Sequence, residues 1–369
     1  MSFSRMTAYL ELLPTLYGIP MCELSVYHGH QQVYRHAVGD RPAGDRTMYR
    51  LFSMTKLFTC TAAMQLMEQG KLDLDDPVGK YLPTYAHMQV MKGGVLTPAE
   101  NTMTIRHLMS MRSGLNYDTA SPELLEARKN PLATTRELML ALGKDPLHFE
   151  PGTEFYYSLS HDVLGAVLEV ITGKTLGELL KEQLFDPLEI ADITFKPTQE
   201  QRSRIAPIYT YLCNTYSVTP LNDVGAPLSQ NYESGGGGLY GTNDQYMKLV
   251  EALANNGIGR SGCRILKPES IAQMKVNHMH EGDILRFSPG KPGYGYGLGV
   301  RTLIDPQTAE GPGPVGEFGW DGAASSYNLV DTENRLAVVF TTHVKNCRPA
   351  FREVHPHIRN LAYLGIGIV

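Results

Sequence analysis

The stretch of sequence that decides the fold reads Leu51-Phe52-Ser53-Met54-Thr55-Lys56-Leu57-Phe58. It opens a segment, residues 53–69, that leaves little polar surface on any side of a helix until Gly70 supplies a stop. A helix that is apolar on nearly every side is a buried one, so we expect 53–69 to run through the core. Ser53 and Lys56 stand three residues apart and therefore share one face of its first turn.

The Ser53 and Lys56 pair has the residue types of an activated nucleophile. A serine hydroxyl attacks poorly until a base removes its proton, and a lysine can do so if burial or positive potential lowers its pKa. A serine in the first turn also places its own N–H where an oxyanion would develop. Spacing alone is weak support, because the chain has a second S-x-x-K run from Ser288 to Lys291 and because Ser53 could simply cap the helix.

Composition and charge exclude several classes of protein. The 369 residues carry a net charge of −5 with both signs scattered, so no basic stripe predicts a nucleic-acid partner. No run approaches the ~20 apolar residues of a membrane span. Residues 1–11 lack the apolar core of a secretory signal, so we expect a cytoplasmic protein. The five cysteines include no C-x-x-C pair, which predicts reduced cysteines rather than a disulfide framework or a zinc cluster.

The periodicity of the chain predicts a sheet built from both of its ends. Alternating segments at 21–27 and 32–38 predict a hairpin, and strand-like composition returns at 296–303, 325–330 and 336–342. Helical periods occur between them, at 104–111, 135–142, 162–172 and 176–183. We therefore expect an α+β fold with a sheet domain formed by 1–72 and 232–369 and a mainly helical inserted domain, 73–231, working as a single unit.

An ordered set of motifs resembles the serine β-lactamase and penicillin-binding-protein superfamily. After the Ser53 run the matches are Leu66 to Val78, Tyr81 to Pro83, Thr104 to Met109, Ser113 to Leu115, Glu150 to Thr153, Leu164-Gly165, Phe185 to Leu188 and Tyr294 to Gly299. The resemblance covers roughly residue 20 to the C-terminus and is closest to class C β-lactamases and the β-lactamase-like (family VIII) carboxylesterases. It implies an antiparallel β-lactamase/transpeptidase-like sheet flanked by helices, with Ser53 as the acylated nucleophile and Lys56 as its proton-handling partner.

The second motif of the family is a Tyr with an Asn two residues on. Here the matching residues are Tyr157-Ser158-Leu159, so the resemblance implies that Tyr157 relays the proton, with Tyr156 as the alternative because the register is uncertain by one residue. The Asn is absent. Its loss removes an amide that would hydrogen-bond a β-lactam side chain or the lysine, which disfavours efficient penicillin turnover.

The third motif, Lys-Thr-Gly or His-x-Gly in the family, corresponds by position to Trp320-Asp321-Gly322. The resemblance implies that the N–H of Ala323 is the second oxyanion donor beside that of Ser53. The cation that would meet a substrate carboxylate is absent. We expect Trp320 to form an apolar wall, although it could simply pack, Asp321 to repel an anion, and Gly322 to let a ligand approach the backbone.

Other clusters are explained more simply as turns or packing. Asp73 to Asp76 lacks the spacing of a calcium loop, and His278 to Glu281 has no HExxH pattern, so no metal site is predicted. Gly235 to Gly238 has no following Lys-Ser/Thr, and the resemblance places it beside the active site. No G-x-S-x-G run occurs, which argues against an α/β-hydrolase.

The sequence therefore predicts a serine hydrolase that forms a covalent acyl-enzyme, with a carboxylic ester of a short or apolar acyl group as its preferred substrate. A small-molecule ester or amide is the expected partner. No metal or organic cofactor, nucleic acid or membrane span is implied, and the oligomeric state is left open. Two alternatives stand: a β-lactamase or D-Ala-type peptidase with the same nucleophile, and a non-catalytic penicillin-binding-like sensor that kept the fold.

Overall fold

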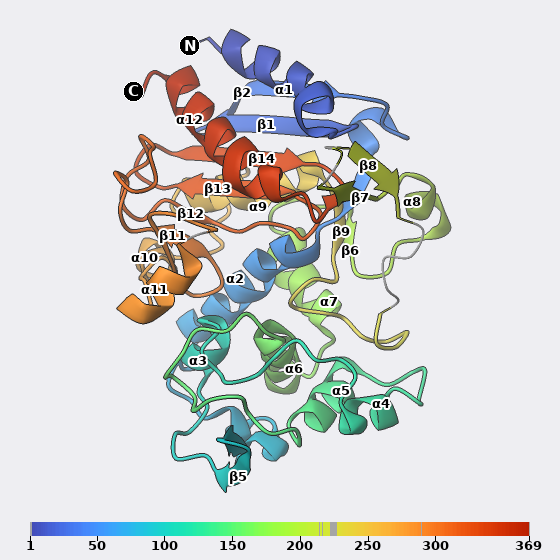
Figure 1. Ribbon diagram of the computed structural model, residues 1–369, viewed down its shortest axis with the longest axis vertical. Helices are drawn as coiled ribbons and strands as arrows, with labels where there is room; N and C mark the ends of the chain where they lie inside the picture. The colour runs from blue at the N-terminus through green and yellow to red at the C-terminus, as the bar shows by residue number, and fades with distance from the viewer. Residues whose placement is uncertain (1, 214, 216, 222–226, 289, 369) are drawn as a thin grey trace.

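The structure is a computed structural model that describes residues 2–213, 215, 217–221, 227–288 and 290–368 (Figure 1). Its centre is an antiparallel sheet of seven strands. In spatial order these are β10 (Tyr294–Tyr296), β11 (Arg301–Leu303), β12 (Phe318–Gly319), β13 (Tyr327–Asp331), β14 (Leu336–Thr341), β1 (Cys22–His28) and β2 (Gln31–Val38). The predicted α+β fold, with a sheet built from both ends of the chain, is confirmed.

Strand β1 joins the two ends by pairing with β14, where Leu24 lies opposite Phe340. Every residue of β14 is buried, because helices cover both faces of the sheet. One face is covered by α1 (Ser4–Tyr17) and α12 (His355–Ile366), and the other by α9 (Asn243–Ala254) (Figure 1). A strand covered on both faces is a continuous apolar run rather than an alternating one, as the sequence of β14 is.

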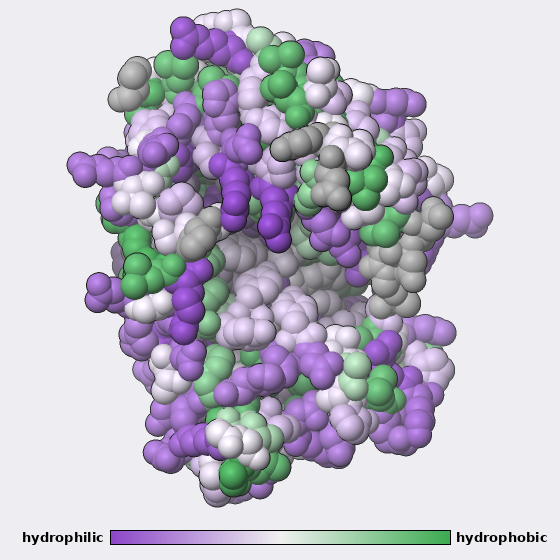
Figure 2. All heavy atoms as spheres, in the orientation of Figure 1, coloured by the Kyte–Doolittle hydropathy of each residue, from purple (hydrophilic) through white to green (hydrophobic). Residues whose placement is uncertain are grey.

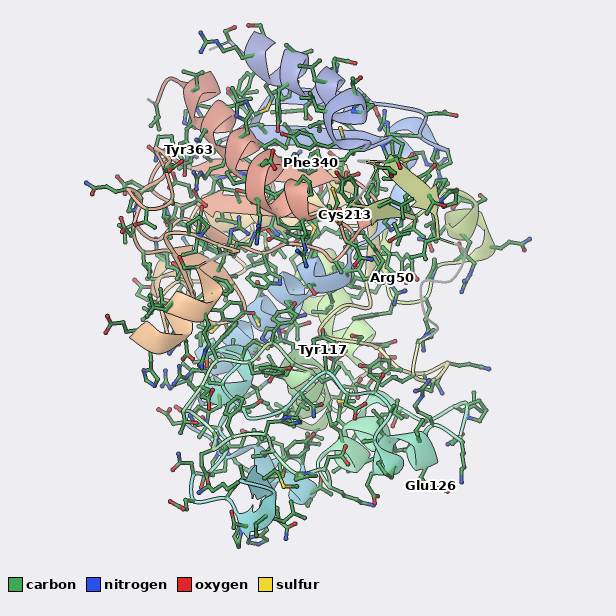
Figure 3. All side chains as sticks on the ribbon, viewed as in Figure 1. Arg50, Tyr117, Glu126, Cys213, Phe340 and Tyr363 are labelled. Atoms are coloured by element: carbon green, nitrogen blue, oxygen red, sulfur yellow. The ribbon has the colours of Figure 1, made fainter. Side chains whose placement is uncertain are left out.

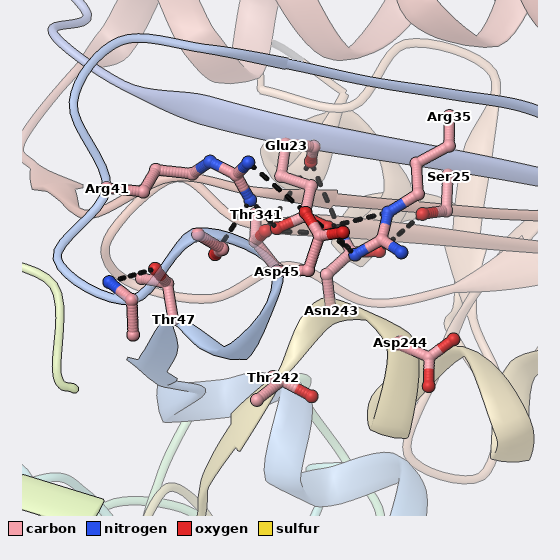
Figure 4. A network of polar contacts seen from close by, with 12 residues as sticks. Glu23, Ser25, Arg35, Arg41, Asp45, Thr47, Thr242, Asn243, Asp244 and Thr341 are labelled. Carbon is pink, nitrogen blue, oxygen red and sulfur yellow. Dashed lines mark hydrogen bonds and ion pairs between the residues drawn. The ribbon is translucent and has the colours of Figure 1, made fainter.

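Buried polar contacts fasten β1 to its neighbours (Figure 4). The Glu23 carboxylate is buried and accepts hydrogen bonds from Arg35 Nη2 at 2.6 Å and Arg41 Nη1 at 2.8 Å. Asn243, the first residue of α9, donates its side-chain amide to the carbonyl oxygens of Glu23 and Val339 at 3.3 and 3.1 Å. These groups therefore have partners inside the protein, and one amide bridges α9, β1 and β14.

The predicted buried helix is present but begins later than expected. Residues Phe52–Met54 form a single 3₁₀ turn, and the α-helix α2 runs over Thr55–Glu68. Nearly all of its side chains are buried, and Gly70 ends it with φ +67°, which a glycine adopts without strain. Ser53 therefore lies in the turn that leads into α2 rather than in the helix itself.

Helices make up most of the lower half of the molecule in Figure 1. They are α3 (Ile105–Met109), α4 (Pro122–Ala127), α5 (Thr135–Leu142), α6 (Ser160–Thr172) and α7 (Leu176–Leu180). The same stretch of chain also contains two hairpins, β4 (Gln89–Lys92) with β5 (Val95–Pro98) and β7 (Tyr209–Leu212) with β8 (Ser217–Pro220). Strand β7 pairs in parallel with β15 (Val344–Lys345), so 73–231 is not purely helical, and its boundaries as an inserted domain stay a prediction.

A search of the described part of the chain for a membrane-crossing helix finds none with the length and apolar character required.

Candidate active site

The three residues predicted to carry the chemistry meet at one point. Tyr157 donates its phenolic O–H to Ser53 Oγ at 2.7 Å, and Lys56 donates from Nζ to the same oxygen at 3.1 Å. Ser53 is half-buried and Lys56 is fully buried. The molecule is hollowed across its middle in Figure 2, with side chains of intermediate hydropathy in the hollow. The fold thus brings Ser53 and Tyr157, which lie 104 positions apart in the chain, into the contact that their motifs predicted.

The backbone around Ser53 is held by a small sheet of β3 (Met48–Arg50), β9 (Tyr240–Thr242) and β6 (Ile193–Thr194). Leu51 donates its N–H to the Leu239 carbonyl at 2.9 Å just before the turn. Phe52 then adopts φ +47°, in the left-handed region that non-glycine residues rarely occupy. The strained residue lies directly before Ser53, as is common where a backbone must present a reactive side chain.

Lys56 is fixed by a second contact, since Nζ also donates to the Gly236 carbonyl at 2.5 Å. The ammonium lies 4.6 Å from the centre of the Tyr157 ring. Burial by itself would lower the pKa of Lys56, but Tyr117, Tyr157 and Asp162 around it outweigh burial and raise that pKa above its usual range. Sequence reasoning had required a lowered pKa for Lys56 to act as the base. The surroundings instead favour a lysine that keeps its proton.

Asp162 on α6 is the carboxylate that faces this lysine. It is buried, and Oδ1 accepts hydrogen bonds from Tyr232 at 2.6 Å, Ser234 at 2.5 Å and the Gly236 N–H at 3.4 Å. Its other oxygen, Oδ2, has no partner within the described residues. A Cβ placed on Gly236 would lie 2.6 Å from Oδ2 of Asp162 and 3.5 Å from Nζ of Lys56, so these two charged atoms are at most about 6 Å apart.

Tyr157 lies in a stack of aromatic rings. Its ring is parallel to those of Tyr117 and Trp320, with centroids 5.7 and 5.6 Å away. The indole N–H of Trp320 donates to the Tyr157 oxygen at 3.0 Å. Tyr156, the alternative for the relay, is 52% exposed and stacks on His148 instead. Of the two neighbouring tyrosines, Tyr157 is the one that contacts Ser53.

The Trp320-Asp321-Gly322 segment places its two large side chains on opposite sides. Trp320 turns toward Tyr157, whereas the buried Asp321 carboxylate binds Lys291 Nζ and lies 3.1 Å from Arg301 Nη1. Burial alone would raise the pKa of Asp321, but Lys291, Arg301 and His355 lower it to about 2. The expectation that Asp321 would repel a substrate anion does not fit this placement, because its charge is matched by Lys291 and the buried Arg301, on the side opposite Trp320.

The two predicted oxyanion donors are the N–H groups of Ser53 and Ala323. Gly322 lies against the backbone before Ser53, because a Cβ there would come within 2.8 Å of the Leu51 carbonyl. The Gly322 N–H donates a hydrogen bond to the Ser326 carbonyl at 2.8 Å, whereas Ala323 is exposed. Within the described residues, the N–H groups of Ser53 and Ala323 have no hydrogen-bond acceptor, so both remain able to bind an oxyanion.

Several other clusters have structural roles. Asp75 pairs with Arg106 and Asp76 with Lys80 in a turn, and His280 caps the short helix α11 (Glu281–Phe287). No group of three or more His, Cys, Asp or Glu is arranged to hold a metal ion in the described ranges. The glycine run 235–238 lies against Lys56 through the Gly236 carbonyl.

Two residues at the site escaped sequence reasoning. Tyr117, labelled between the sheet half and the helical half in Figure 3, stacks on Tyr157. It follows the Ser113 to Leu115 match by two residues, which could have drawn attention to it. Asp162 is an acidic residue among the buried side chains of α6. A carboxylate in a segment that is otherwise apolar, one turn after the second motif, is a signal in the sequence, because a buried charge is normally paired.

Comparison with known proteins supports the resemblance inferred from the motifs. The family model described as Beta-lactamase matches residues 7–362. Protein Rv1367c of Mycobacterium tuberculosis is 29% identical over 83% of this chain and 80% of its own length. Esterase EstB of Burkholderia gladioli is 28% identical over 86% of this chain and 83% of its own. The solved structure of EstCE1, a hydrolase with promiscuous acyltransferase activity, covers 98% of both chains at a TM-score of 0.79 and 26% identity. The predicted resemblance and the fold that it implies are confirmed.

Proposed function

Because the chain belongs to the β-lactamase family, we propose that it is a carboxylesterase that forms a covalent acyl-enzyme on Ser53. The family and its relatives support a hydrolase or an acyltransferase of this fold. The observation that carries the finer proposal is the pair of contacts on Ser53 Oγ, from Tyr157 at 2.7 Å and Lys56 at 3.1 Å. A nucleophile, a proton acceptor and a cation within hydrogen-bond reach are what acyl transfer requires.

In the proposed reaction Lys56 stays protonated and Tyr157 moves the protons. Before the reaction, the Tyr157 hydroxyl loses its proton to water. The resulting phenolate is stabilised by the ammonium of Lys56 and the indole N–H of Trp320. Ser53 Oγ then attacks the ester carbon while its proton passes to Tyr157, and the N–H groups of Ser53 and Ala323 bind the oxyanion. Tyr157 returns that proton to the departing alcohol oxygen.

Water completes the reaction by the same steps. Tyr157 takes a proton from the water that attacks the acyl group on Ser53, and gives it back to Ser53 Oγ as the carboxylic acid leaves. Each proton that Tyr157 accepts is therefore passed on, so the pair is restored after each turnover.

An uncharged ester is the substrate that the third motif favours. Trp320 offers an indole N–H to Tyr157 where the family carries a lysine or histidine, and Asp321 is turned to the far side. The segment then presents no cation to a substrate carboxylate, which supports an ester with a short or apolar acyl group over a β-lactam or a peptide with a free C-terminus.

The first test is the mass of the intact protein after treatment with a fluorophosphonate probe. We expect one adduct on the wild type and none on a Ser53→Ala variant, because only an activated serine reacts. Absence of an adduct on the wild type would favour the non-catalytic sensor instead.

The second test compares substrate classes by kcat/KM. We expect p-nitrophenyl butyrate to be hydrolysed faster than nitrocefin, benzylpenicillin and a D-Ala-D-Ala peptide. A faster β-lactam or peptide would overturn the ester assignment while leaving Ser53 as the nucleophile.

Acyl transfer to an alcohol is a second candidate, because the similar structure of EstCE1 is described as having promiscuous acyltransferase activity. Adding 1-butanol to the p-nitrophenyl butyrate reaction and measuring butyl butyrate by gas chromatography separates the two outcomes. Formation of butyl butyrate in preference to butyric acid would make the protein a transferase rather than a hydrolase.

A further inference from the structure

A pocket lined in part by Tyr157 lies between the segment before α6 and helix α11. It has a volume of about 410 Å³. Its lining residues come from the segment before α6 and from helix α11, and they are Glu154, Phe155, Tyr156, Tyr157, Asp283, Arg286 and Phe287. Because Tyr157 lines this pocket and also donates to Ser53 Oγ at 2.7 Å, the pocket lies one side chain away from the proposed nucleophile.

Aromatic rings form most of the pocket wall. Phe287 is nearly parallel to Trp320, with centroids 6.4 Å apart, and meets Phe155 edge-on at 5.5 Å. Phe155 in turn packs on Tyr296 at 5.1 Å. Rings arranged in this way offer flat faces and edges that bind another flat apolar group better than an alkyl chain of the same area.

The pocket is held open by a buried carboxylate. Asp283 of α11 pairs with Arg112 at 2.9 Å, and both side chains are buried. Asp283 Oδ1 also accepts the Phe155 N–H at 3.1 Å, so it fastens α11 to the segment that carries Tyr157. A pocket whose two walls are tied together by buried charges is formed before the ligand arrives, which reduces the ordering cost of binding.

The charges at the mouth of the pocket cancel one another. Arg286 lies 2.6 Å from Asp283 Oδ1 and 3.3 Å from Glu154 Oε2. Arg112 neutralises the remaining charge of Asp283. The pocket therefore offers no unpaired charge to a ligand, and an uncharged group suits it.

The role of Tyr157 in the proposed reaction indicates which half of the ester lies next to the pocket. In the proposed reaction Tyr157 gives a proton to the departing alcohol, so the alcohol oxygen must lie next to the Tyr157 hydroxyl. The pocket that Tyr157 also lines is then the nearest space for a large group attached to that oxygen. We propose that this pocket binds the alcohol half of the substrate, and that the natural substrate is an uncharged ester of an aromatic or similarly flat alcohol. This inference rests on the proposed esterase function.

The test keeps the butyryl group constant and varies the alcohol. Ethyl butyrate, benzyl butyrate and 2-naphthylmethyl butyrate are compared by following acid release in a pH-stat. We expect kcat/KM for the two aromatic esters to exceed that for ethyl butyrate by about tenfold, which is the effect of one good aromatic contact with its buried area.

A Phe287→Ala variant should lose most of that advantage, so that its kcat/KM falls several-fold more for benzyl butyrate than for ethyl butyrate. Leu285→Ala is the matched control, because Leu285 belongs to the same helix but is 70% exposed and does not line the pocket. It should behave as the wild type with every ester. Melting temperatures of both variants check that α11 remains folded, and Phe287→Leu, which keeps apolar bulk without a ring, replaces Phe287→Ala if that variant is unfolded.

The opposite series, ethyl phenylacetate against ethyl butyrate, tests the acyl half. The proposal is overturned if Phe287→Ala impairs ethyl phenylacetate rather than benzyl butyrate, or if it impairs ethyl and benzyl butyrate equally. Wild type that hydrolyses ethyl butyrate through Ser53 but gains nothing from an aromatic alcohol would overturn the pocket assignment alone. Hydrolysis of ethyl butyrate that is unchanged in Ser53→Ala would instead overturn the proposed function.

Discussion

The chain contains two S-x-x-K segments with the same spacing and opposite surroundings. At Ser53 the lysine is buried beneath the serine and donates to its oxygen at 3.1 Å. At Ser288 the serine follows the end of α11, and Lys291 turns away to bind Asp321 behind the third motif. Burial and the nearby Arg301 and Arg359 lower the pKa of Lys291, although Asp321 opposes them, whereas tyrosines and Asp162 raise the pKa of Lys56. The same spacing therefore occurs in two different environments, and spacing alone does not identify the proposed nucleophile.

Removing each serine gives the largest expected difference between the segments. Ser53→Ala should lower kcat for p-nitrophenyl butyrate by at least about 10³-fold, because it removes the proposed nucleophile. Ser288→Ala should leave kcat unchanged. Initial rates of the two purified variants check this, and a comparable loss in both would show that the segments cannot be told apart by their surroundings.

Removing each lysine should separate rate from stability. Lys56→Met is expected to lower kcat by about 10²- to 10³-fold, as loss of a group that supports proton transfer does. Lys291→Met leaves the buried Asp321 short of a partner and should cost about 3 kcal/mol of unfolding free energy. Urea unfolding and kcat are measured for both variants. Equal losses of rate would contradict the assignment, and Lys291→Met combined with Asp321→Asn should recover stability.

Acid should lower the free energy of unfolding by weakening the ion pair between Lys291 and Asp321. The pKa of Asp321 is lowered to about 2 in the folded protein, below its value in the unfolded chain. Its stabilisation is therefore complete above about pH 4 and is lost as the pH falls toward 2, by up to about 2 kcal/mol. Urea unfolding at several pH values between 5 and 2 measures the slope. An Asp321→Asn variant should show a shallower slope, and an identical slope would contradict the attribution.

Asp162→Asn should shift the pH dependence of the Ser53 site. The negative charge of Asp162 helps to raise the pKa of Lys56, so its removal should lower that pKa and make the protonated, active form disappear at lower pH. The alkaline limb of the kcat profile should therefore move to lower pH. The expected loss is confined to the alkaline side of the optimum.

Glu233→Gln is the matched control for Asp162→Asn. Glu233 is a neighbouring buried carboxylate that binds the Gly177 N–H at 2.6 Å, and no contact links it to Lys56. The alkaline limb should stay in place in this variant. A limb that moves equally in both variants would indicate a general effect of charge rather than the contact with Lys56.

Sequence patterns predicted those helices and strands that are determined by residues close to one another in the chain. The apolar run after Ser53 identified a buried helix, yet the α-helix starts at Thr55, because the left-handed Phe52 imposes a 3₁₀ turn that propensity does not reveal. Sequence could have predicted that Trp320 and Asp321 point in opposite directions, since successive residues of an extended segment do so. The identity of the cations behind Asp321 was not, because Lys291 and Arg301 reach it only through the sheet.

The charge of Lys56 was the part of the site that sequence could not supply. Burial of a lysine suggests a lowered pKa, and the sequence around Ser53 contains no acidic residue to reverse it. Asp162 and Tyr117 come from other parts of the chain, and only the fold brings them to the ammonium. The strands β7 and β8 were missed for a related reason, since β7 gains its partner β15 from a segment more than 130 residues away.

The pairing of β1 with β14 also sets an order of events during synthesis. A ribosome that has made Ser53, Lys56 and Tyr157 has not yet made β14, the strand on which β1 must lie, nor Ala323 with its oxyanion N–H. Strand β1 pairs with a strand that is made much later, since Leu24 lies opposite Phe340, 316 residues downstream. A nascent chain therefore emerges with the proposed nucleophile exposed in an unfinished site, and contacts of such long range are slow to form. Catalysis should appear only after the last strands have left the ribosome.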